Sequence, residues 1–328
     1  MKGLKIVAFS GLAIVMAGAV TTQIARTWIE ARVPQDGTLV DVDGTRLHVV
    51  DRGEGPVIVL IHGLMGQLRN FPPKLVETLS EGHRVILVDR PGSGYSDPLP
   101  SGQDRISDQA DAIAALIDRL ELGAPTVVGH SLGGAVALSL ALDHPARVGA
   151  LALVAPATRP REEAPSAFGA IAVESSFIRR ALSLTFATPL GLMIFDRAAS
   201  EIFAPEPLPE AFATTGGGLL ALPPDNYVAG GEDLVALRAA LPNLLARYGD
   251  LELPVGILFG SDDQIVDPAW NGQWVAEQVS GATYTEIGGG HMISFTSPEV
   301  VAEWVLDVAG RTHLPPNRSS VAEGLSTE

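Results

Sequence analysis

The segment from Gly129 to Gly133, Gly-His-Ser-Leu-Gly, carries the residue types of a nucleophilic site. It follows a strand-like run at Thr126–Val128 and precedes a helix-forming run at Leu132–Leu142. A turn that packs a strand end against a helix start leaves no room for side chains two residues either side of its centre, which accounts for the glycines. Such a turn exposes the Ser131 hydroxyl at a helix N-terminus, where developing negative charge is stabilised. The pattern predicts a serine nucleophile; the alternative is a tight turn with an ordinary capping serine.

A serine hydroxyl is a weak nucleophile and needs a base. Of the seven histidines, His291 is the candidate, because it follows three glycines in a loop between a strand-like run at Thr283–Ile287 and the last helical run. That position lies at the carboxyl end of a strand, on the same edge of a parallel sheet as Ser131. The other histidines are predicted to shape turns, be structural or be solvated: His62 and His130 in turn motifs, and His48, His83, His144 and His313 elsewhere.

The base in turn needs a carboxylate that fixes its tautomer and stabilises the imidazolium. Two adjacent aspartates, Asp262 and Asp263, follow a buried strand-like run at Val255–Phe259. Either side chain could turn toward His291. We prefer Asp263 as the acid and keep Asp262 as the alternative.

The oxyanion formed by nucleophilic attack needs N–H donors already in place. The backbone N–H of Leu132 directly follows the nucleophile. A second donor is expected from the loop His62–Gly66, after the strand-like run Val57–Ile61, with the N–H of Leu64 as the candidate. Another glycine-rich loop, Asp89–Ser96, is expected to brace the edge of the sheet, because its Gly-x-Gly is too short for a nucleotide fingerprint.

A parallel sheet would bring these loops together. Runs that are apolar on both faces predict central parallel strands, and helical periodicity, as at Ile106–Leu120, lies between them. This alternation predicts an α/β fold with helices on both faces of the sheet. Asp43-Gly44 predicts a hairpin ahead of it. The predicted buried strands are Val57–Ile61, Val85–Val88, Thr126–Val128, Leu151–Val154 and Val255–Phe259.

The chain is predicted to divide into four parts. Residues 1–33 form an N-terminal segment, and residues 34–156 and 250–311 hold the strands and helices of the core. Residues 157–249 contain apolar helical runs such as Phe177–Phe195 and are predicted to form a helical cap, since a structureless loop of that length is improbable. Residues 312–328 are polar and without periodicity, which predicts a flexible tail.

The N-terminal segment differs from the rest of the chain in charge. The whole chain has a formal net charge of −16, but residues 1–32 hold four basic side chains and one acidic side chain, so the remainder carries −19. The uncharged run Ile6–Ala25 would measure about 30 Å as a helix, enough for a membrane anchor with Trp28 at the interface. The alternatives are a cleaved signal peptide with a site at Ala17–Ala19 and an ordinary core helix. Either an anchor or a signal peptide exports the body to the periplasmic or extracellular side.

The composition excludes several classes of function. A hydrophobic content of 46% excludes a disordered chain, and the acidic balance argues against nucleic acid as a partner. The absence of cysteine excludes a cysteine nucleophile, disulfides and thiolate metal sites. No pattern indicates a metal, an organic cofactor or an oligomeric state.

Together these motifs resemble the α/β-hydrolase superfamily, in the branch with a helical cap inserted after the sixth strand. The resemblance covers about Thr38–Arg311. It rests on the His-Gly loop after the first central strand, the Asp-Arg-Pro-Gly-x-Gly-x-Ser loop, the Gly-His-Ser-Leu-Gly-Gly turn, and the later Gly-x-x-Asp and Gly-His motifs. The chain order of nucleophile, acid and base is also that of this superfamily.

The resemblance implies an eight-stranded, mostly parallel sheet and a Ser131, Asp263 and His291 triad. It implies the amides of Leu64 and Leu132 as the oxyanion hole. The family places its acid three residues after a glycine, which favours Asp263 over Asp262.

The departures from the family pattern narrow the expected chemistry. Haloalkane dehalogenases and epoxide hydrolases of this fold use an aspartate nucleophile, so Ser131 argues against both. Proline iminopeptidases and many carbon–carbon bond hydrolases have other glycine-rich loops than His62–Gly66. The resemblance therefore implies hydrolysis of carboxylic esters. The predicted cap is rich in Leu, Ala, Phe and Ile and poor in charge, which predicts a small apolar ester as substrate. The alternatives are a cofactor-free haloperoxidase or perhydrolase, a lactonase or an amidase on the same triad, and a non-catalytic binding protein on the same fold.

Overall fold

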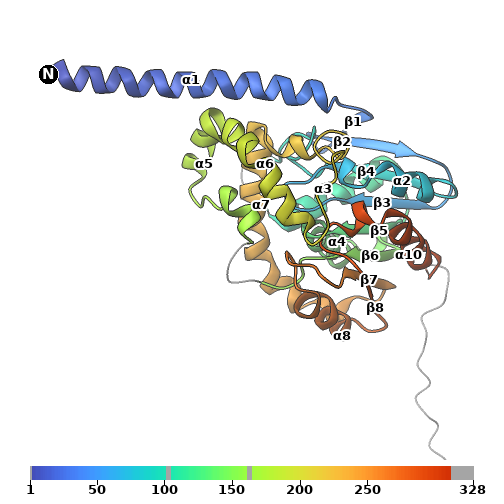
Figure 1. The fold of residues 1–328 in the computed structure, drawn as a ribbon. Coiled ribbons are helices and arrows are strands. Elements are labelled where there is room, and N and C mark those ends of the chain that lie inside the picture. Colours follow the sequence, from blue (N-terminus) through green and yellow to red (C-terminus); the bar gives the residue numbers. More distant parts are fainter. Residues whose placement is uncertain (1, 101–104, 161–164, 312–328) are drawn as a thin grey trace, which may run out of the picture.

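The computed structural model describes residues 2–100, 105–160 and 165–311, with side chains from Gly11 onward; the predicted tail at 312–328 lies outside them. An eight-stranded sheet has the order β1-β2-β4-β3-β5-β6-β7-β8 (Figure 1). Neighbouring strands from β4 to β8 are parallel, and β2 is antiparallel to both of its neighbours. The predicted α/β fold with a mostly parallel sheet is confirmed. The strands are β1 (Thr38–Val42), β2 (Thr45–Arg52), β3 (Val57–Ile61), β4 (Arg84–Val88), β5 (Thr126–His130), β6 (Ala150–Val154), β7 (Val255–Gly260) and β8 (Thr283–Ile287).

Helices pack on both faces of the sheet because its central strands are apolar on both sides. In β3, Val59 and Ile61 join the core cluster beneath α3 and α4, whereas Ile58 and Leu60 join the cluster beneath α2 and α10. The helices that flank the sheet are α2 (Pro73–Ser80), α3 (Ile106–Arg119), α4 (Leu132–Asp143), α8 (Trp274–Gln278), α9 (Ile293–Thr296) and α10 (Pro298–Gly310).

The hairpin before the central strands has the predicted turn. Asp43 and Gly44 have φ angles of 52° and 86°, the left-handed conformation that an Asp-Gly turn provides. β1 and β2 pair directly across it, from Val42 with Thr45 to Thr38 with Val49.

Between β6 and β7 lies a helical segment, residues 157–249, which we call the insertion. Its helix α7 reaches back to pack against α3 and α4. The helices of the insertion are η3 (Ser166–Ile171), α5 (Ser176–Leu182), the π-helical turn η4 (Ser183–Ala187), α6 (Thr188–Phe203), η5 (Gly218–Ala221) and α7 (Pro224–Leu245).

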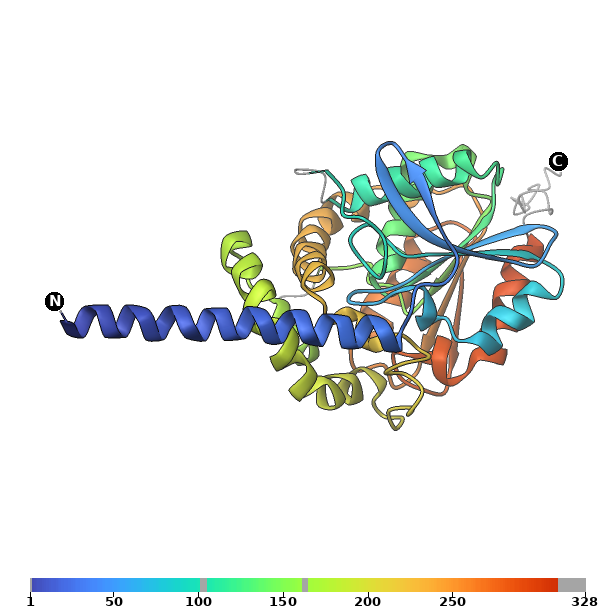
Figure 2. The same ribbon diagram turned by 90° about the horizontal axis from the view of Figure 1, so that it is seen from above.

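The N-terminal helix α1 (Lys2–Arg32) lies along the insertion and projects beyond it (Figures 1 and 2). Ile29 and Val33 are buried against Leu219 and Leu220 of the insertion, and Tyr95 donates a hydrogen bond to the carbonyl oxygen of Val33. Among the described residues, α1 from Gly11 and the continuous helical stretch 176–203 are long and apolar enough to cross a membrane, by length and composition only.

A buried histidine connects the segment after α1 to the sheet. His48 in β2 places Nδ1 2.7 Å from Oδ2 of Asp89, while its Nε2 contacts the carbonyl oxygen of Asp36. Both partners only accept hydrogen bonds, so the doubly protonated ring satisfies both. Burial alone lowers the pKa of His48, but the hydrogen bond and charge of Asp89, together with Asp36, outweigh it and raise that pKa above its usual value of 6.5.

A pH-dependent contribution to stability follows from His48. Because its pKa is raised in the folded state, the contribution is fully present below the unfolded value, and it is lost as the pH rises through the folded value. We expect the difference in free energy of unfolding between the wild type and His48→Gln, measured in urea, to shrink as the pH rises from about 5.5 to about 8.5.

His83→Gln is the matched control. Burial lowers the pKa of His83, so its contribution changes with pH in the opposite direction. A difference for His48→Gln that stays constant or grows with pH would contradict the assignment.

Candidate active site

Ser131 occupies a strained turn between β5 and α4. Its φ of 55° and ψ of −121° lie outside the regions that non-glycine residues favour. Three backbone hydrogen bonds hold this conformation. The N–H of Ser131 donates to the carbonyl of Val154 at 3.0 Å, and its carbonyl accepts from the N–H groups of Gly134 and Ala157 at 2.9 and 3.0 Å. In such a strand-to-helix turn, this backbone conformation exposes the serine hydroxyl at the edge of the sheet.

Close backbone packing explains the glycines on either side of Ser131. A Cβ atom on Gly129 would lie 2.5 Å from the carbonyl oxygen of Gly133. A Cβ atom on Gly133 would lie 2.3 Å from the carbonyl oxygen of Ile61 and 2.5 Å from that of His62. The start of α4 therefore touches the ends of both β3 and β5.

His291 is hydrogen-bonded to Asp263 and not to its neighbour. Nδ1 of His291 lies 2.8 Å from Oδ2 of Asp263, and both side chains are buried. The other oxygen of Asp263 accepts from the N–H groups of Ile265 and Val266 at 2.8 and 2.9 Å, which fixes the carboxylate. Asp262 is exposed, and its carboxylate accepts from the Ser261 hydroxyl.

The imidazole of His291 and the hydroxyl-bearing Ser131 line the same cavity. His130 lies beside them, with Nε2 3.1 Å from the carbonyl oxygen of His291 and the two rings 4.9 Å apart. Burial, and then the neighbouring His291, lower the pKa of His130 to about 3. His130 is therefore neutral and donates to the loop that carries His291, in agreement with its predicted backbone-shaping role.

Two backbone N–H groups lie near the serine. Leu132 is the first residue of α4, so its N–H has no acceptor within the helix. Leu64 follows β3 in the loop of residues 62–66, which we call the oxyanion loop after its expected role, and it lines the same cavity as Ser131. A Cβ atom on Gly63 would lie 2.9 Å from the Cβ of Ser131, so glycine lets this loop approach.

Arg90 supports the oxyanion loop, a role that the sequence analysis missed. Its guanidinium donates to the carbonyl oxygens of His62 and Gly63 at 3.0 and 2.9 Å, and to the amide oxygen of Gln109 at 2.7 Å. It also forms a buried ion pair of 2.8 Å with Asp233 of α7. The available signal was an arginine two residues after a strand whose last four residues are apolar, in a loop predicted to brace the sheet edge.

His62 completes this support. Its Nδ1 donates to the carbonyl of Gly63 at 2.9 Å and its Nε2 accepts from the N–H of Arg90 at 2.9 Å. Burial, followed by the charge of Arg90, lowers the pKa of His62 well below its usual range. A neutral ring with a fixed tautomer therefore holds the loop, as predicted for a turn-shaping histidine.

A model of the alpha/beta hydrolase fold matches residues 56–298. The chain belongs to the α/β-hydrolase fold family. It is 29% identical over 268 residues to a putative carbamate hydrolase, RutD, of Variovorax paradoxus, covering 80% of this chain and 94% of that protein. It is 41% identical over 117 residues to the dihydrolipoyllysine-residue acetyltransferase component of the acetoin cleaving system of Cupriavidus necator, covering 35% of this chain but only 31% of that protein. The crystal structure of an enol-lactonase from Burkholderia xenovorans superposes with a TM-score of 0.68 at 25% identity, covering 83% of this chain and 99% of that one.

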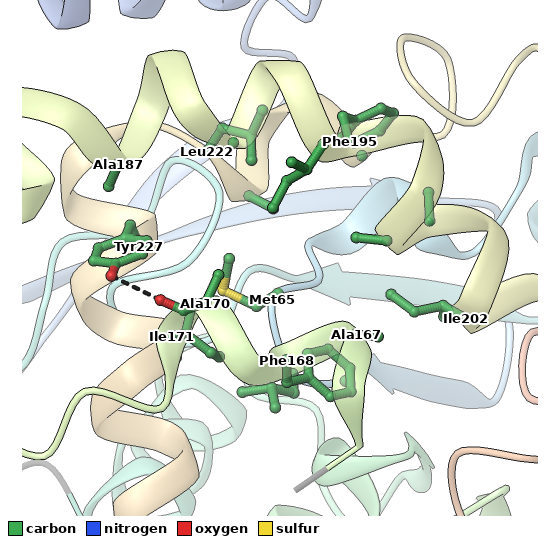
Figure 3. A pocket seen from close by; sticks show the side chains of 18 of the residues that line it. Met65, Ala167, Phe168, Ala170, Ile171, Ala187, Phe195, Ile202, Leu222 and Tyr227 are labelled. Atoms are coloured by element: carbon green, nitrogen blue, oxygen red, sulfur yellow. Dashed lines mark hydrogen bonds between the residues drawn. The ribbon is translucent and has the colours of Figure 1, made fainter.

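The cavity of this hydrolase has a volume of about 290 Å³ and an almost entirely apolar wall. Figure 3 shows side chains from the oxyanion loop (Met65), η3 (Phe168) and α6 (Phe195 and Ile202) gathered around it. The hydroxyl of Tyr227 lines the cavity but donates to the carbonyl of Ala170 at 2.9 Å. Ser131, His130 and His291 provide its polar end.

The close contact at Gly133 gives a test of how this hydrolase positions its serine. Gly133→Ala forces a methyl group against two backbone carbonyl oxygens, so we expect a loss of about 1–3 kcal/mol in the free energy of unfolding. Displacement of Ser131 should also lower its rate of labelling by a fluorophosphonate probe. Urea unfolding and labelling kinetics measure the two effects.

Gly82→Ala serves as the control, because a Cβ atom there meets nothing within 4 Å. Equal stability and labelling in the two alanine variants would show that the contact at Gly133 is not tight.

Proposed function

We propose that this protein is a serine hydrolase that cleaves carboxylic esters through an acyl-enzyme on Ser131. The observation that carries the proposal is the buried hydrogen bond of 2.8 Å between His291 and Asp263, with Ser131 on the wall of the same cavity. Asp263 occupies Nδ1 of the ring, which leaves Nε2 to serve as the base. The similarity to a putative carbamate hydrolase and to an enol-lactonase supports hydrolysis as the class of reaction.

The reaction follows from these groups. The Oγ of Ser131 attacks the acyl carbon while Nε2 of His291 takes the hydroxyl proton, and Asp263 stabilises the imidazolium. The C–O bond to the alcohol then breaks, and His291 returns the proton to the leaving alkoxide oxygen. A water molecule, deprotonated by the same nitrogen, then attacks the acyl carbon. The bond between that carbon and Oγ of Ser131 breaks, His291 returns the proton to Oγ, and the carboxylic acid is released.

The negative charge on the tetrahedral intermediate needs fixed donors. The N–H groups of Leu64 and Leu132 are the proposed oxyanion hole. Arg90 supports this assignment, because its bonds to the carbonyls of His62 and Gly63 hold the peptide planes of the oxyanion loop. Donors held in this way need no reorganisation when the oxyanion forms.

An apolar acyl group is the proposed ligand of the cavity. The wall offers side chains such as Phe168, Ile171 and Ile202, and it is mostly apolar. Burial of apolar surface contributes about 25 cal/mol per Å², so such a wall favours longer acyl chains. We assign the insertion to a cap, residues 157–249, that encloses this group above a core of residues 34–156 and 250–311.

We further infer that α1 anchors the protein in a membrane, with the catalytic body on the periplasmic or extracellular side. The contrast between a basic N-terminal segment and a body of net charge −19 supports this orientation. Contacts of Gly18, Thr22 and Ile29 with the insertion favour a retained helix over a cleaved signal peptide, because cleavage near Gly18 would remove part of a packed surface.

Substitutions in the proposed triad test the mechanism. Ser131→Ala should abolish hydrolysis of p-nitrophenyl butyrate and labelling by a fluorophosphonate probe. Asp263→Asn should lower kcat by roughly 10⁴-fold, because an amide holds the wrong tautomer of His291.

The adjacent aspartate provides a matched control. Asp262→Asn changes the same functional group one residue away, on an exposed side chain that lies outside the hydrogen bond to His291, so its kcat should stay within about twofold of the wild type. Full activity of Ser131→Ala, or equal losses in the two asparagine variants, would refute the assignment.

The cavity wall predicts a preference for chain length. Ala187 faces the cavity (Figure 3), and Ala187→Phe fills part of it. We expect the ratio of kcat/KM for p-nitrophenyl decanoate to that for the acetate to fall by roughly tenfold or more, since several methylenes lose their buried site.

Ala239→Phe, at an exposed position of α7 that does not line the cavity, controls for a general effect of adding a phenyl ring. An unchanged ratio in Ala187→Phe would mean that the acyl chain binds elsewhere.

A further inference from the structure

Large apolar side chains are exposed on α5, η4 and α6. Phe177 and Met193 are each 81% exposed. Exposed apolar surface of this kind is typical of sites that contact a membrane or a protein partner. We call this surface the outer apolar face; it comprises Phe177, Ile178, Leu184, Leu190, Met193 and Ile194.

Helix α1 lies directly beside this face. It packs through a narrow stripe in which Gly18, Thr22 and Ile29 follow one another at helical spacing. Thr22 donates a hydrogen bond of 2.6 Å to the carbonyl of Thr185, and a Cβ atom on Gly18 would lie 2.6 Å from the ring of Phe186. From Gly11 onward, the large apolar side chains of α1 other than Ile29 are exposed: Leu12, Ile14, Val15, Met16, Val20, Ile24 and Trp28.

If α1 spans a membrane, the place where the insertion contacts α1 determines how deep the insertion lies in that membrane. The uncharged run Ile6–Ala25 matches the apolar core of a bilayer, about 30 Å. The residues before Gly18 supply about 18 Å of that length, so about 12 Å lies beside η4 and α6. An α1 that spans the bilayer therefore carries this edge of the insertion into the layer where interfacial helices lie.

The exposed residues of α6 change from apolar to charged along the helix, as this depth in the membrane predicts. Leu190, Met193 and Ile194 are exposed and apolar, whereas the next exposed residues, Asp196 and Arg197, are charged. An apolar end followed by a charged end is the pattern of a helix that leaves the membrane interface.

The substrate cavity opens on the same face. Leu190 and Ile194 line the cavity and are also 56% and 47% exposed, so they form its rim. Phe186, which packs against α1, lines the cavity as well. An acyl chain that enters at this rim passes from lipid to an apolar wall without crossing water.

We propose that the outer apolar face inserts into the membrane beside α1, and that the enzyme takes its substrate, an ester with one long acyl chain, directly from the lipid. This inference rests on the proposed ester hydrolysis and on anchoring by α1. A neutral lipid surface fits best, because a body of net charge −19 is repelled by anionic headgroups.

Site-directed labelling tests the surface without relying on activity. The chain has no cysteine, so Met193→Cys and Val300→Cys each give a single nitroxide site in the full-length protein in phosphatidylcholine vesicles. Val300 is an exposed apolar residue on α10, at 47%, and serves as the control. The label at 193 should be relaxed by oxygen, which partitions into lipid, and the label at 300 by a water-soluble nickel complex.

Ester hydrolysis tests the route of the substrate. The double variant Phe177→Ser with Met193→Ser changes two exposed residues that do not line the cavity. In the vesicles, its kcat/KM for p-nitrophenyl palmitate dissolved in the bilayer should fall by roughly tenfold or more, while that for water-soluble p-nitrophenyl acetate stays within about twofold. Leu39→Ser with Val300→Ser, on the core, should change neither rate.

The outcomes separate this inference from the proposed function. A label at 193 that is as accessible to the nickel complex as the label at 300 overturns insertion, whatever the activity. Undiminished hydrolysis of the palmitate ester by the double variant overturns delivery from lipid. A lipid-buried label in a protein that cleaves neither ester supports insertion and overturns ester hydrolysis instead.

Discussion

The backbone contact between the start of α4 and the ends of β3 and β5 is the constraint on which the site depends. No side chain fits at Gly129 or Gly133, because a Cβ atom at either position would lie within 2.5 Å of a carbonyl oxygen. This contact accompanies the positive φ angle of Ser131, and backbone hydrogen bonds with Val154 of β6, Gly134 of α4 and Ala157 hold the residue there. The fold tolerates the strained backbone of Ser131 because the parallel sheet is packed against apolar clusters on both faces.

The position of the oxyanion loop also depends on the buried ion pair of Arg90 and Asp233. Removing two charges from water is costly, and the pair persists because the guanidinium also bonds to two carbonyls of the oxyanion loop and to Gln109. Asp233 lies on α7, so the same group that holds the oxyanion loop also positions a helix of the insertion. Arg90 therefore connects the oxyanion loop to α7, and both of these elements contribute residues to the cavity.

Much of this arrangement could be predicted because it depends on patterns of neighbouring residues. Runs that are apolar on both faces predicted the central strands, and the glycines with the strand-like and helical runs beside them predicted the turn around Ser131. The residues alone favoured Asp263 but left Asp262 open as the alternative, since adjacent side chains differ only in how the loop turns. The hydrogen bonds that Asp263 accepts from Ile265 and Val266 fix that turn.

Long-range partners could not be predicted in the same way. Arg90 and Asp233 form an ion pair but lie far apart in the sequence, and no pattern near either residue indicates the other as its partner. The N-terminal run was interpreted from its lack of charge, which says nothing of the packed stripe at Gly18 and Thr22. Such contacts depend on which surfaces the folded sheet and insertion bring together, and a single sequence does not encode that in any nearby pattern.

The stripe on α1 has a structural consequence beyond anchoring. Gly18 allows the ring of Phe186 to lie against the helix backbone, and Phe186 is also part of the cavity wall. At the other end of the contact, Ile29 packs with Leu219 and Leu220, which precede the cavity-lining Leu222. The N-terminal helix therefore supports the cavity from outside, so the element proposed to hold the protein in the membrane is also one that shapes where an acyl chain binds.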